Sequence, residues 1–142
     1  MKALDITPFV INWCHDNNTS ITNLKLQKLL YFIQGEYCRH EHGRIIDDDF
    51  YAWQLGPVIP AIYDRYSIYS AAELPREEVT TLSDDIKNFL ASVLSVYGKH
   101  SAWSLVDLSH EQDPWKYNYQ IFGKNSLIPF DAIREFFEDN DT

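Results

Sequence analysis

Cysteine and histidine lie close together at two points of the sequence, and each arrangement suggests a different chemistry. Cys38 and His42 would share one face of a helix, as metal ligands often do, but His40 between them points to another face. No second pair with CxxC or HxxxH spacing completes four ligands. Cys14 precedes His15, and adjacent helical side chains diverge by about 100°, so these two cannot form a thiol–imidazole pair. We therefore expect neither a metal nor a cofactor.

A third candidate is the polar turn that holds His110 and Asp113 and ends with Pro114 and Trp115. A histidine base oriented by a carboxylate would suit a small hydrolase, but no nucleophile accompanies the pair. The sequence also lacks the GxSxG, P-loop, GxGxxG and HExxH patterns. We expect a structural turn, closed onto the helical core by Trp115, in a protein that is not an enzyme. A hydrolase that uses His110 is kept as an alternative.

Composition restricts the classes of protein that the sequence fits. The 142 residues make one domain, 1–142, and a 45% share of hydrophobic residues excludes overall disorder. The 12 basic and 21 acidic residues give a net charge of −9, which disfavours binding to nucleic acid. No apolar run reaches the roughly 18 residues of a membrane span, and no signal peptide is recognisable. We expect a cytoplasmic protein with two reduced cysteines and no membrane contact.

The strongest secondary-structure pattern covers residues 23–42. Thr22 is a good N-cap, and Leu26 and Leu30 lie on one of two apolar faces, with Gln27 between the faces. A helix with two apolar faces is usually packed on both sides. The pattern therefore predicts that this helix lies at the centre of the fold.

One residue of this helix, Phe32, falls within a strip of charged residues that includes Lys25 and Lys28. A large aromatic ring rarely stays in water without cause, so we expect Phe32 to be buried beneath the loop 109–119. The alternative is an aromatic anchor within a basic rim, which would enter an apolar pocket of a partner.

The fold class predicted from the whole pattern is mainly α. We expect a compact bundle of about six helices around residues 23–42, with a minor extended element near residues 50–53. The helices are predicted at residues 7–16, 23–42, 57–66 with a start near Ile59, 84–97, 101–108 and 130–138.

The boundaries of these elements follow from local signals. Thr7 is expected to cap the first helix, with Pro8 at its first position. Residues 67–82 are predicted as a connector, and residues 109–128 as turns rich in aromatic side chains. The acidic tail 139–142 is expected to fray.

Three segments together form a specific pattern. The first is Thr-x-Leu-Lys-Leu-Gln-Lys-Leu-Leu-Tyr-Phe at 22–32, the second is Trp-Gln-x-Gly-Pro-Val at 53–58, and the third is Leu-Ser-His-Glu-Gln-Asp-Pro-Trp at 108–115. In this order and spacing the sequence resembles the Panacea domain family, also called SocA-like or phage-associated GepA-like proteins. The resemblance extends from about residue 6 to residue 137.

The resemblance implies a compact helical domain that acts as the antitoxin of a toxin–antitoxin system, often encoded in or near a prophage. Such an antitoxin neutralises its toxin by direct protein–protein binding. Two alternatives are an adaptor that delivers a bound client to an ATP-dependent protease and a phage-associated host-interaction protein. The charge of −9 suits a basic toxin.

The candidate residues fall into two groups. Aromatic side chains are frequent anchors of protein interfaces. The predicted partner contacts are Phe32, Lys28, Trp53, Tyr63 and Tyr66. Structural roles are expected for the motif residues Thr22, Leu26, Gln27, Leu30, Trp53, Gly56, Pro57, His110, Asp113, Pro114 and Trp115.

Overall fold

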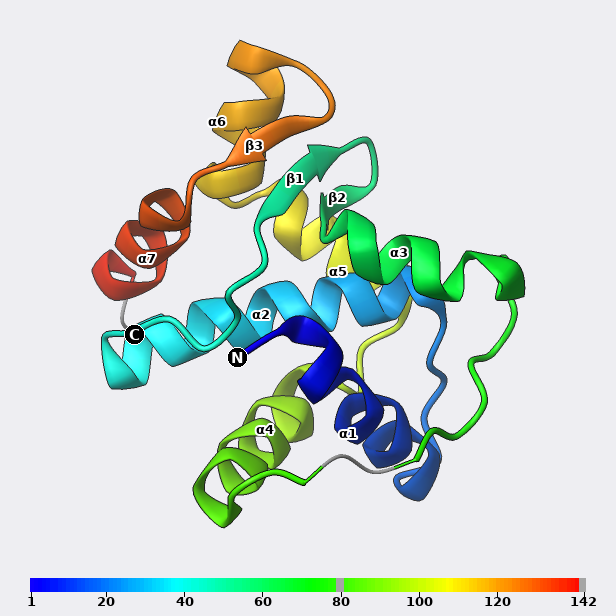
Figure 1. Ribbon diagram of the computed structural model, residues 1–142. Coiled ribbons are helices and arrows are strands. Elements are labelled where there is room, and N and C mark those ends of the chain that lie inside the picture. Colours follow the sequence, from blue (N-terminus) through cyan, green and yellow to red (C-terminus); the bar gives the residue numbers. More distant parts are fainter. Residues whose placement is uncertain (79–80, 141–142) are drawn as a thin grey trace.

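One helix, α2 (Asn23–Glu41), crosses the middle of the protein and is buried along most of its length (Figure 1). Thr22 Oγ1 accepts a hydrogen bond from the backbone N–H of Lys25 at 3.3 Å, as expected of an N-cap. The helix ends at Glu41, and His42 follows with a left-handed φ of 56°. The prediction of a central helix is confirmed.

The computed structural model describes residues 1–78 and 81–140, and within these ranges six further α-helices surround α2 (Figure 1). The three strands form an antiparallel sheet in the order β2–β1–β3. The mainly α prediction is therefore confirmed. The elements besides α2 are α1 (Ala3–Asp16), β1 (Phe50–Trp53), β2 (Gly56–Val58), α3 (Pro60–Tyr66), the 3-10 turn η1 (Ser67–Tyr69), α4 (Asp84–Tyr97), α5 (Ala102–His110), α6 (Asp113–Phe122), β3 (Ser126–Ile128) and α7 (Phe130–Asp139).

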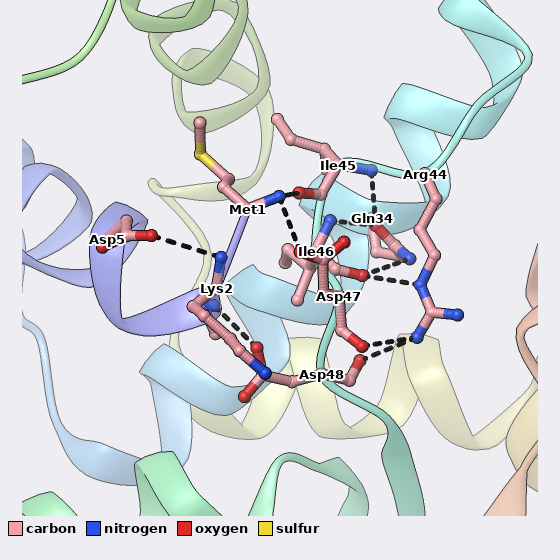
Figure 2. A network of polar contacts seen from close by, with 10 residues as sticks. Met1, Lys2, Asp5, Gln34, Arg44, Ile45, Ile46, Asp47 and Asp48 are labelled. Atoms are coloured by element: carbon pink, nitrogen blue, oxygen red, sulfur yellow. Dashed lines mark hydrogen bonds and ion pairs between the residues drawn. The ribbon is translucent and has the colours of Figure 1, made fainter.

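Helix α1 begins at Ala3, so the prediction that Thr7 caps it and Pro8 starts it is wrong. A residue distant in sequence bonds to its first turn: the backbone N–H of Ala3 donates to Asp48 Oδ1 at 2.8 Å. Met1, two residues before the helix, is also bonded to the loop that follows α2, because its ammonium donates to the carbonyl oxygen of Ile45 at 3.0 Å (Figure 2). These long-range bonds satisfy groups at the helix start that local capping signals do not cover.

The loop between α2 and β1 is fixed by two side chains (Figure 2). Gln34 Oε1 accepts hydrogen bonds from the N–H groups of Ile45 and Ile46, at 3.2 and 3.0 Å. Arg44 donates to the carbonyl oxygens of Ile46 and Asp47, at 2.8 and 2.9 Å. Since these backbone groups lie outside any helix or strand, the two side chains supply partners that they would otherwise lack. Strand β1 therefore starts from a defined position.

Residues 109–128, predicted as turns, contain helix α6 and strand β3. Asp113 and Pro114 occupy the first turn of α6, where a proline removes no helical hydrogen bond. Strand β3 pairs with β1, with Leu127 opposite Tyr51. Aromatic residues lie on all sides of α6, so its sequence shows no clear apolar repeat of helical period. Strand β3, with three residues, is too short to show a repeat.

The first two residues of the predicted frayed tail, 139–142, have defined contacts. Asp139 belongs to α7, and Asn140 Nδ2 donates to the carbonyl oxygen of Phe136 at 2.7 Å. Residues 141 and 142 lie outside the part of the chain that the structure describes, as do residues 79 and 80 of the predicted connector.

Gly35 of α2 lies directly against the Phe137 ring of α7. A Cβ atom at Gly35 would lie 2.2 Å from the ring of Phe137, far inside van der Waals contact. We expect Gly35→Ala to lower the free energy of unfolding by about 1–3 kcal/mol, as overpacking of a core usually does. Urea unfolding measures this change. Gly43→Ala is the control, because a Cβ there would meet nothing nearer than 3.6 Å. Equal stability of both variants would mean that the Phe137 ring moves aside freely.

Candidate functional site

The β1–β2 hairpin is held against α2 by two polar side chains of the first motif segment. The fully buried Nζ of Lys28 donates to the carbonyl oxygen of Pro57 at 2.9 Å. The backbone N–H of Ile59 donates to Gln27 Oε1 at 2.9 Å. These bonds join the first motif segment to the second, so both act as parts of one scaffold.

Gly56 lets the hairpin lie directly on the helices beneath it. Its φ is +113°, a conformation that other residues adopt only with strain. A Cβ at this position would lie 2.8 Å from both Lys28 Cε and Ser109 Oγ. The residues Gly56 and Pro57 form strand β2, which corrects the prediction that a helix begins at residue 57; α3 begins at Pro60, near the predicted start at Ile59.

The third motif segment closes onto the same hairpin through Trp115. Its Nε1 donates to the carbonyl oxygen of Trp53 at 2.7 Å. The indole lies between two stacked rings, His110 at 4.0 Å and Tyr119 at 4.7 Å between centroids. The three motif segments therefore meet at one place, and Trp115 joins α5, α6 and β1.

His110 takes part in this packing. Its ring lies flat on Trp115, and burial lowers its pKa, as does the nearby Lys28. No hydrogen bond joins His110 to Asp113 within the described residues. Asp113 instead begins α6. The base and orienting carboxylate of a hydrolase are therefore not assembled in this arrangement.

Lys25 and Lys28, which the sequence places in a charged strip of α2, are both buried, and burial affects the pKa of each. Lys25 Nζ donates to Gly98 O at 2.7 Å, at the negative end of the α4 dipole, and to Thr19 Oγ1 at 3.0 Å. Burial lowers the pKa of Lys25. For Lys28, with Pro57 O as its acceptor, burial lowers the pKa to about 7. These two lysines are thus part of the interior.

Phe32 is buried, but the loop 109–119 does not cover it. Its ring stacks on Tyr97 of α4 with 4.4 Å between centroids, and the edges of Tyr31 and Phe137 complete the contact. The predicted cover was wrong because α4 and α7 pack on this side of α2. The folded protein therefore offers no Phe32 surface to a partner.

Two of the five predicted partner contacts reach the surface. Lys28, Phe32 and Tyr66 lie inside, and the Tyr66 hydroxyl donates to Glu77 Oε1 at 2.7 Å. Trp53 is half-buried and Tyr63 is 39% exposed, and their rings meet edge to face with 5.0 Å between centroids. Only these two could contact a partner without unfolding of the core.

Trp53 and Tyr63 line an open groove of about 530 Å³ between the hairpin turn, the start of α2 and the start of α5. Leu55 at the hairpin tip and Trp103 of α5 also line it, and the exposed fraction of Trp103 is 60%. The lining residues are Thr22, Asn23, Leu24, Gln27, Trp53, Gln54, Leu55, Val58, Tyr63, Ser70, Ala71, Ala102 and Trp103. We call this surface the aromatic groove.

Trp103 is the groove residue that sequence reasoning missed. On a helical wheel it lies outside the arc of the buried residues Leu105, Ser109 and Val106, about 60° beyond Val106. A tryptophan outside the buried stripe of a short helix was the available signal. Leu55, an apolar residue in the middle of a hairpin turn, was a second one.

Two further observations concern metal binding and membranes. Among residues 1–78 and 81–140, no three histidine, cysteine or acidic side chains are grouped so that they could hold a metal ion. Within the same ranges, no helix is long and apolar enough to cross a membrane.

Comparisons with known proteins give a consistent result. The sequence profile of the family described as "Antitoxin SocA-like, Panacea domain" matches residues 26–116, which include the hairpin, Lys28 and Trp115. Antitoxin SocA of Caulobacter vibrioides (strain NA1000 / CB15N) is 31% identical over 109 residues, 67% of this chain and 58% of that relative. The chain therefore spans less than two thirds of the length of this relative. No solved structure matches the chain.

Proposed function

The chain belongs to the antitoxin SocA-like, Panacea-domain family, and on this premise we propose that it neutralises a toxin protein by direct binding. Neutralisation of this kind is stoichiometric and requires no catalytic residue. The observation that carries the proposal is the aromatic groove, which lies on a hairpin that the matched residues hold in place.

The aromatic groove has the composition of an interface centre. Trp and Tyr are enriched among residues that dominate binding energy, and an exposed apolar patch often marks a binding surface. Trp53 is held by a 3.0 Å hydrogen bond from its Nε1 to Asn125 Oδ1, and Asn23 Nδ2 donates to Tyr63 O at 3.1 Å. Side chains and backbone fixed in this way lose little entropy on binding, which favours affinity.

The test begins with the product of the neighbouring gene. We expect its expression alone to stop growth, co-expression of this chain to restore growth, and the two proteins to purify together. An unchanged toxin level in the rescued cells indicates inhibition, whereas a falling level that depends on an ATP-dependent protease indicates an adaptor. If co-expression does not restore growth, the proposed function is wrong.

Trp103→Ala separates binding from folding. We expect the dissociation constant for the toxin to rise about tenfold or more, because an exposed tryptophan of an interface contributes at least about 1.4 kcal/mol. The melting temperature should stay at the parent value, since the side chain is 60% exposed. Phe122→Ala is the matched control: it removes a 66% exposed ring from α6, away from the groove. Neutralisation that is unaffected by Trp103→Ala would place the interface elsewhere.

A further inference from the structure

A second groove of about 660 Å³ shares Trp53 with the aromatic groove. It runs along the loop that precedes β1 and the start of α3. Its lining includes four carboxylates and one ammonium, from Asp47, Asp48, Asp49, Asp64 and Lys2. We call this surface the acidic groove.

Two of these carboxylates already have partners of opposite charge. Asp47 pairs with the Met1 ammonium at 3.1 Å, and Asp49 pairs with Arg44 at 3.1 Å. Asp48, part of the network in Figure 2, accepts the 2.8 Å hydrogen bond from the backbone N–H of Ala3 at the start of α1. Within the described residues neither Asp48 nor Asp64 forms an ion pair. With the Lys2 ammonium counted beside the Met1 and Arg44 partners, the four carboxylates of the acidic groove still leave it one negative charge.

The charge selects among possible occupants. A second copy of this chain would bring another net charge of −9 to the surface, and like charges across an interface are unfavourable. A nucleic acid would bring phosphates to the same carboxylates. A basic protein segment satisfies the carboxylates, and a large apolar side chain on the same segment suits the neighbouring aromatic groove.

We propose that the toxin binds through a segment that places an apolar or aromatic side chain in the aromatic groove and a nearby lysine or arginine in the acidic groove. Trp53, which lines both, forms the ridge between them. This inference rests on the proposed function and adds the location and chemistry of the interface. The apolar contact slows dissociation, while the charges act mainly on association.

The test compares two pairs of charge-removing substitutions in binding kinetics with the neutralised toxin. Asp48→Asn with Asp64→Asn removes the two unpaired charges; asparagine at 48 keeps an oxygen for the Ala3 N–H. Glu135→Gln with Asp139→Asn removes the same charge from a separate groove between α6 and α7. We expect the first pair to slow association about fivefold or more at low salt, with the difference fading at high salt, and the second pair to change it less than about twofold.

Charge reversal gives a second readout that does not depend on the fold of the Asp48 loop. Asp64 is exposed, so Asp64→Lys should leave the melting temperature unchanged while it weakens binding about tenfold or more. Replacing the contacting lysine or arginine of the toxin with glutamate should restore binding to this variant. Equal effects of the two pairs, or no effect of Asp64→Lys in a chain that still neutralises the toxin, would overturn this inference and leave the proposed function standing. Absence of neutralisation by the parent chain would overturn both.

Discussion

Replacing Trp115 with alanine is expected to lower the free energy of unfolding by about 3–5 kcal/mol, a large share of the stability of an ordinary domain. The change removes an indole that is 8% exposed and that lies between His110 and Tyr119. It also leaves the carbonyl oxygen of Trp53 without the donor that now lies 2.7 Å away. Since this bond joins α6 to β1, the hairpin should loosen as the helix does. Thermal melting followed by circular dichroism measures the loss.

Two further substitutions separate the causes. Trp115→Phe keeps most of the ring but removes the Nε1 donor, so it should cost less, about 1–3 kcal/mol for an unsatisfied buried group. Tyr117→Ala, two residues along α6 and 59% exposed, should stay within about 0.5 kcal/mol of the parent. We expect toxin binding by Trp115→Ala to fall only as far as the folded fraction falls. A variant that melts like the parent but does not bind would make Trp115 an interface residue.

The elements that could be predicted are those whose signals are local. Thr22, Ser83 and Ser101 each accept a hydrogen bond from the backbone N–H three residues later, as their positions before apolar repeats indicate. Helix α4 shows an apolar residue every three or four positions and begins where its cap predicts. Interactions between residues close in sequence are sufficient to predict such elements.

Prediction failed where the deciding partner is distant in sequence. Helix α1 starts early because of Asp48, and Lys28 is buried because Pro57 supplies an acceptor. A helical wheel assigns lysines to solvent, so Phe32 seemed to lie in a charged strip. Once α4 and α7 pack on that side, Phe32 and both lysines are interior, and neither covering helix has a signal within residues 23–42.

The candidate site could also be predicted only in part from the sequence. The motif segments that gave the resemblance are largely scaffold, since Gln27, Lys28 and Trp115 use their polar atoms to hold the hairpin. The aromatic groove on this scaffold is lined partly by motif residues such as Trp53, and partly by residues that the pattern leaves unspecified, Leu55 at its variable position and Trp103 outside it. The motifs therefore mark the hairpin that carries the candidate surface, while its exposed residue Trp103 lies outside all three of them.

Lys28→Met is expected to gain stability over the parent as the pH falls. Burial lowers the pKa of Lys28 to about 7 in the folded protein, from 10.5 in the unfolded chain. Between these values the unfolded chain holds the proton more strongly, so a fall in pH through this window favours unfolding of the parent. Below about pH 7 both states are protonated and the penalty stops growing. Methionine has a similar length and no charge, so the variant escapes this penalty.

The size of this stability difference depends on how much of the range between the two pKa values the change in pH crosses. From pH 9 to pH 6 the advantage of Lys28→Met over the parent should grow by about 2–3 kcal/mol, since each pKa unit is worth about 1.4 kcal/mol. Loss of the bond to Pro57 O subtracts a constant cost of about 1–3 kcal/mol, so the variant can be the less stable protein at pH 9. Urea unfolding at both pH values measures the difference, with the exposed Lys116→Met as control. A difference between variant and parent that is equal at pH 6 and pH 9 would mean that Lys28 keeps its charge inside the folded protein.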